Sequence, residues 1–129
     1  MKTIKEFIPV DIYKSGVHLM VGDDIVEMRN SIIKDYPLFS ETKLDNLAGL
    51  CTYKDEYCGN MWIFLTPDST VPAISHECNH AAMHILRQHG VEIDVYNQEP
   101  LTYLQEYILS KILEFTESKK VEFLMYNKY

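Results

Sequence analysis

Apolar residues recur at helical spacing between residues 70 and 89, and this pattern predicts a long amphipathic helix. The positions expected to face the core are Val71, Ile74, Cys78, Ala81, Ala82, Ile85 and Leu86. Signals for the two ends of a helix flank this stripe. Asp68-Ser69-Thr70 offers N-cap oxygens, Pro72 suits the first turn, and Gly90 supplies a stop after the last turn. The helix is therefore expected to begin near Thr70 and to end before Gly90.

A second apolar stripe predicts another helix, which starts near Pro100. Its buried side is expected to consist of Leu101, Leu104, Ile108, Ile112 and Phe115. Because only the short connection from Gly90 to Gln98 joins the two helices, they should pack antiparallel. The start of the second helix would then lie against the middle of the first.

Shorter apolar runs in the first half of the chain predict two β-hairpins separated by a helix. The predicted strands cover residues 7–13, 17–21, 50–53 and 61–65, and the helix runs from Asp23 or Asp24 to about Asp35. The order β-β-α-β-β-α-α indicates one small α+β domain, residues 1–129, with a short antiparallel sheet and a packed C-terminal helix. Residues 119–129 are set apart as a candidate tail.

Composition changes this picture little, but it argues against several classes of protein. The chain has 129 residues, of which 47% are hydrophobic, and a formal net charge of −7. Because Lys and Arg are not clustered, binding to nucleic acid is not expected. The apolar runs are too short for a membrane span and the first residues lack the apolar stretch of a signal peptide, so we expect a cytoplasmic protein. In that compartment Cys51, Cys58 and Cys78 are expected to be free thiols.

The candidate chemistry lies in the first long helix, where His76-Glu77-Cys78-Asn79-His80 spells H-E-x-x-H. Two histidines four residues apart lie on the same face of a helix, so their imidazoles can bind one zinc ion. The glutamate after the first histidine is then near the open position of the metal, where it can take a proton from bound water. Neither histidine belongs to the predicted core stripe. The motif therefore predicts a zinc site with Glu77 as general base.

A catalytic zinc site needs a third protein ligand, and Glu99 is the predicted one. It opens the second helix, which the antiparallel packing should bring against the motif. Glu106, on the same predicted face, and His84, one turn beyond His80, are the alternatives. Two histidines and one glutamate would leave a fourth position for water.

The motif, followed by Asn97-Gln98-Glu99 on a second helix, resembles the gluzincin class of zinc metallopeptidases. The longer stretch from Thr70 to Ile108 is similar to small metallopeptidase-like proteins encoded by bacteriophages. This resemblance implies a minimal zincin-like domain with an active-site helix, and a zinc-dependent peptidase that acts on a peptide or protein substrate. The strand at residues 61–65 is then either an edge strand that pairs with extended substrate or a buried central strand.

The predicted positions suggest a role for each candidate residue. His76, His80 and Glu99 would bind the zinc ion, and Glu77 would activate the zinc-bound water for attack on the peptide carbonyl. Tyr103, or His84 if it reaches inward, would stabilise the oxyanion that forms in the attack.

A second hypothesis is a catalytically inactive zinc-binding accessory protein that acts by binding a host protein. The nine tyrosines, the acidic charge and the segment after Lys120 would suit an interaction surface. A chance H-E-x-x-H on a surface helix is the third interpretation. Substitution of Glu77 by Gln separates the first two hypotheses, because only a peptidase would lose its function.

Overall fold

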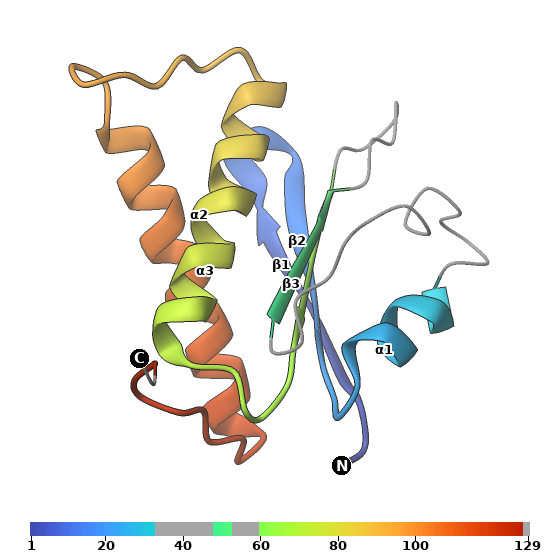
Figure 1. Cartoon of the computed structure of the whole chain (residues 1–129). Helices are drawn as coiled ribbons and strands as arrows, with labels where there is room; N and C mark the ends of the chain where they lie inside the picture. The colour runs from blue at the N-terminus through green and yellow to red at the C-terminus, as the bar shows by residue number, and fades with distance from the viewer. Residues whose placement is uncertain (33–47, 53–59, 128–129) are drawn as a thin grey trace.

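The computed structural model of the chain describes residues 1–32, the backbone of 48–52, and residues 60–127 (Figure 1). The elements follow one another as β1 (Ile4–Val10), the 3-10 turn η1 (Asp11–Tyr13), β2 (Ser15–Val21), α1 (Ile25–Ile32), β3 (Ala48–Thr52), β4 (Met61–Leu65), α2 (Val71–Gln88) and α3 (Glu99–Ser118). This mixture of helices and strands confirms the predicted small α+β class. No helix among the described residues is long and apolar enough to cross a membrane.

The four strands form one sheet in the order β1-β2-β4-β3. Both predicted hairpins pair antiparallel, β1 with β2 and β3 with β4. The inner strands of the two hairpins, however, pair parallel, with Val17 opposite Met61 and Val21 opposite Leu65. The sheet as a whole is therefore mixed, which corrects the expectation of a purely antiparallel sheet. The pairing suits β4, because all five of its residues are buried, as in a strand covered on both faces.

The position of β4 decides between the two interpretations of residues 61–65. It is a central strand between β2 and β3, and the edges of the sheet are β1 and β3. Backbone pairing of a substrate with Met61–Leu65 is thus not available in this fold.

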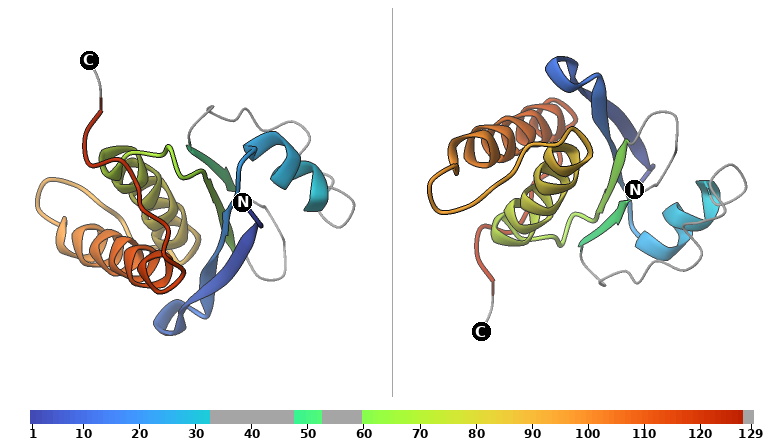
Figure 2. Two further views of the ribbon diagram at one scale, coloured as in Figure 1. Left: turned by 90° about the horizontal axis from the view of Figure 1, so that it is seen from below. Right: turned by 90° about the horizontal axis from the view of Figure 1, so that it is seen from above.

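Helices cover both faces of the sheet, and each face has its own core. Helices α2 and α3 lie side by side on one face and α1 lies on the other (Figure 2). The larger core lies under α2 and α3, and the smaller one joins α1 to Met20, Trp62 and Phe64. Every predicted core residue of α2 except Val71 is fully buried. The hydrophobic stripe therefore sets which side of α2 faces the sheet, and hence which side faces solvent.

The boundary signals of α2 act as predicted. Thr70 is the N-cap, and its hydroxyl accepts a hydrogen bond of 3.2 Å from the Ala73 N–H. At the other end Gly90 has φ of +71°, and the Val91 N–H donates to the Leu86 carbonyl at 3.0 Å. This left-handed glycine closes the last turn.

Residues after α3 return along the start of α2 (Figure 1). The Val71 N–H donates to the Leu124 carbonyl at 2.8 Å, and the Leu124 N–H donates to the Ser69 carbonyl at 3.1 Å. The Thr70 hydroxyl also forms a hydrogen bond with the amide oxygen of Asn127. The candidate tail thus contacts, as far as Asn127, the segment that leads into the H-E-x-x-H helix.

Two predictions fall partly outside the described residues. Asp24 begins α1 as expected, since its carboxylate accepts from the Glu27 N–H at 3.1 Å, but the predicted end near Asp35 is not described. The side chains of Cys51 and Cys58 also lie outside the described part of the chain.

Candidate metal-binding site

His76 and His80 lie on the exposed face of α2, opposite the buried stripe. Their Nε2 atoms are 3.0 Å apart and share a hydrogen bond, and the two rings meet edge to face at 74°. A tetrahedral zinc ion with bonds of 2.0–2.1 Å needs its two nitrogens about 3.3 Å apart. The two Nε2 atoms are therefore already close to the separation that a shared metal ion requires. Imidazole nitrogens are also suited to bind zinc.

Glu77 lies on the flank of α2 that faces away from α3. Asn79 marks the side toward α3, because its amide donates to the Gln105 side-chain oxygen at 3.1 Å. Successive residues of a helix turn by about 100°, so Glu77 is about 200° away from Asn79 around the axis. Its side chain is half-buried beside the exposed histidine pair. This places a carboxylate next to the pair but on the opposite side from α3.

Cys78 faces the core, as predicted, and it is fully buried. Burial, reinforced by the charge of Glu77, raises the pKa of its thiol to about 12. Cys78 thus faces the core, away from the exposed histidine pair, and is not placed to share a metal ion with it.

The structure does not group Glu99 with the histidine pair, so its role as third ligand stays a prediction. The side chain of Gln105 donates to the Ser75 carbonyl at 3.0 Å and accepts from Asn79, so these residues lie at the same level of the two helices. Glu99 precedes Gln105 by six residues, or about 9 Å along the axis of α3. Since α2 and α3 run antiparallel, this offset carries Glu99 past His80, toward the C-terminal end of α2.

The alternative ligands are placed differently. Glu106 follows Gln105 directly, so it lies on α3 level with the first half of the motif, and its side chain is exposed. His84 is half-buried one turn beyond His80, about 6 Å further along α2. Among the described residues, no three His, Cys, Asp or Glu side chains come together as a metal site. The structure therefore brings together two of the predicted zinc ligands, His76 and His80, and groups no third described residue with them.

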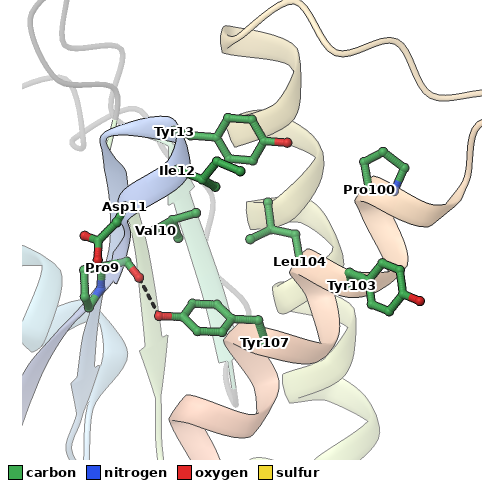
Figure 3. A pocket seen from close by; sticks show the side chains of 9 residues that line it. All are labelled: Pro9, Val10, Asp11, Ile12, Tyr13, Pro100, Tyr103, Leu104 and Tyr107. Atoms are coloured by element: carbon green, nitrogen blue, oxygen red, sulfur yellow. Dashed lines mark hydrogen bonds between the residues drawn. The ribbon is translucent and has the colours of Figure 1, made fainter.

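Tyr103 points away from the contact between α3 and α2, so its role as oxyanion stabiliser stays a prediction without support from this geometry. It precedes Gln105 by two residues and so points about 200° away from the contact with α2. Instead it lines a pocket of about 420 Å³ between η1 and α3, together with Tyr107 and Leu104 (Figure 3). The residue is 67% exposed.

The contact that fixes α3 against α2 was not recognised in the sequence. Gln105 reaches Ser75 and Asn79, which flank His76 on α2, and its amide also donates to the Ser75 hydroxyl at 3.2 Å. A polar residue next to the apolar position Leu104 is the signal that could have indicated an interhelical contact.

Comparisons with known proteins add no further assignment. The chain matches no family model, no curated protein and no solved structure at a significant level. The resemblance to zinc peptidases therefore rests on the motif and on the placement of its histidines.

Proposed function

We propose that this chain is a zinc-dependent peptidase that holds its metal through His76 and His80 and uses Glu77 as general base. The observation that carries the proposal is the 3.0 Å separation of the two Nε2 atoms on an exposed helix face. Zinc, when bound, would polarise a peptide carbonyl and make a nearby water more acidic. A solvent-facing pair is also accessible to a peptide substrate.

Each motif residue has one task in this proposal. An ion bound by His76 and His80 would replace the hydrogen bond between their Nε2 atoms, so both imidazoles must be neutral and carry their proton on Nδ1 for binding. Glu77 takes one proton from the attacking water and returns it to the leaving amide nitrogen, so that the carboxylate is regenerated in each cycle. The buried stripe on the other side of α2 keeps these three side chains on a rigid element.

For the third ligand, the register of α3 supports Glu106 over Glu99. Glu106 lies at the level of the motif and is exposed, so its side chain is free to change rotamer when an ion is present. Glu99 would require α3 to slide by about 9 Å, which the Gln105 hydrogen bonds and the buried face of α3 oppose.

A second candidate function is the zinc-binding accessory protein without catalysis. It is favoured by one observation, namely that the described residues group only two ligands. In this alternative the half-buried Glu77 would have no role in proton transfer, and activity would be absent from the wild type.

Peptide cleavage measured with Glu77→Gln tests the proposal. We expect the rate to fall by about 10²- to 10⁴-fold, as for loss of a general base, while zinc content and fold are kept. Glu92→Gln is the matched control, because Glu92 is an exposed glutamate in the connection between α2 and α3. Equal cleavage by wild type, Glu77→Gln and chelated protein would contradict the peptidase and leave the accessory protein.

A further inference from the structure

The solvent face of α2 carries a third metal-binding side chain, which the proposed zinc chemistry does not use. Met83 follows His80 by three residues and is 44% exposed, so it lies outside the buried stripe of the helix. Its thioether sulfur cannot act as a general base, but it is a ligand for soft metal ions.

The geometry of an α-helix brings Met83 beside the histidine pair. Each residue turns the helix by about 100°, so Met83 lies about 20° from His76 and about 60° from His80 around the axis. Along the axis it is about 4.5 Å beyond His80, and residues three apart on a helix are surface neighbours. Side chains of a helix lean toward its N-terminal end, so that of Met83 extends back toward His80. The two imidazoles and the thioether therefore share one strip of the solvent face.

The charges along this strip favour a soft ion of low charge. In α2 from His76 to Arg87, the exposed residues are His76, His80, Met83 and Arg87, and none of them has a carboxylate. Glu77 is half-buried on the flank of the helix. Hard divalent ions prefer oxygen ligands. Because Coulomb repulsion grows with charge, Arg87 also opposes a monovalent ion less than a divalent one.

Two imidazoles and one thioether form a ligand set suited to copper(I). Thioether sulfur is among the ligands that select this ion, whereas zinc sites in proteins use imidazole, thiolate and carboxylate. The methionine side chain has three rotatable bonds, so its sulfur can adjust to an ion held by the histidines. We propose that His76, His80 and Met83 bind copper(I) in place of zinc. The inference shares the histidine pair with the proposed peptidase and does not rest on catalysis.

The test must remove other soft ligands of the chain from competition. Thiols also bind copper(I), so the titration uses a parent protein with Cys51→Ser and Cys58→Ser. Cys78 is kept, because it is fully buried and faces the core. Copper(I) is titrated without oxygen against bicinchoninate, a coloured copper(I) chelator that reports the affinity. We expect one copper(I) per chain in this parent protein.

Met83→Leu in that parent is the decisive variant, because leucine keeps an apolar side chain of similar size without the sulfur. Copper(I) affinity should fall by about tenfold or more, since even partners behind metal ligands affect affinity by 10- to 100-fold. Zinc affinity should stay within about twofold of the parent. Met125→Leu, at a methionine that is 63% exposed after α3, is the matched control and should change neither affinity.

Methyl NMR of the chain with its natural cysteines gives the place of binding independently of these substitutions. With ¹³C-labelled methionine methyl groups and copper(I) in excess over the thiols, the Met83 signal should shift and the Met125 signal should not. An unshifted Met83 signal would overturn the inference.

The outcomes separate this inference from the proposed peptidase. Equal copper(I) affinity in Met83→Leu and Met125→Leu, or an equal loss of copper(I) and zinc affinity in Met83→Leu, would overturn the inference. Zinc binding and peptide cleavage without copper(I) binding would overturn it alone. Copper(I) binding that needs Met83, in a protein that cleaves no peptide, would support it and contradict only the peptidase.

Discussion

The histidine pair on α2 and the pocket beside α3 lie on different faces of the same helical layer, and they are built in different ways. The pair is set by the helix alone, because residues four apart meet on one face whatever packs around them. The pocket needs β1, η1 and α3 to meet, and the hydrogen bond from Tyr107 to Pro9 joins residues 98 positions apart in the sequence. A site that depends on local geometry can thus be recognised in the sequence, whereas one that depends on packing cannot.

The sharpest way to test this difference is to ask whether α3 contributes a ligand to the proposed zinc site. If Glu106 completes the site, Glu106→Gln should weaken zinc affinity by about tenfold or more, since even residues behind the ligands affect affinity by 10- to 100-fold. Glu99→Gln is the matched control on the same helix, and its zinc affinity should stay within about twofold of the wild type. Isothermal titration with zinc measures both. A larger loss of zinc affinity in Glu99→Gln than in Glu106→Gln would identify Glu99 as the ligand. That result would contradict the argument from the register of α3 against α2.

Gln105→Ala tests the contact that fixes the register. Loss of the hydrogen bonds to Ser75 and Asn79 should lower the free energy of unfolding by about 1–2 kcal/mol. Urea denaturation measures this change, and Thr102→Ala, at an exposed position of α3, is the control. If the variant also loses zinc affinity, the site depends on the α2–α3 register. Unchanged stability would mean that apolar packing alone sets the register.

Features set by neighbouring residues could be predicted from the sequence, and features set by distant residues could not. The N-cap at Thr70, the stop at Gly90 and the burial of Cys78 depend on neighbours along the helix, and all three were predicted. The parallel pairing of β2 with β4 and the direction in which Tyr103 points depend on residues far apart in the chain. No local pattern carries that information, so these features emerged only in the structure.

The smallest expected effect concerns pH and the other face of the sheet. The His18 ring stacks on Trp62 with centroids 4.2 Å apart and also contacts Phe7, and burial lowers its pKa below the usual 6.5. The folded protein therefore holds the neutral form. As pH falls below about 6.5, the unfolded chain takes up a proton more readily, so stability should fall.

Melting temperatures at pH 7.5 and pH 5.5 measure this dependence. His18→Phe should lose less stability than the wild type over that interval, because phenylalanine keeps the ring contacts without a titrating group. An identical pH dependence in the two proteins would exclude His18 as its source.

The central claim is that the Nε2 atoms of His76 and His80 bind one metal ion, and a zinc titration of the metal-free chain tests it most directly. The account predicts one zinc per chain for the wild type, loss of binding in His76→Ala and in His80→Ala, and retention in His89→Ala. A wild-type protein that binds no zinc, or that binds it equally well without these two histidines, would contradict the account.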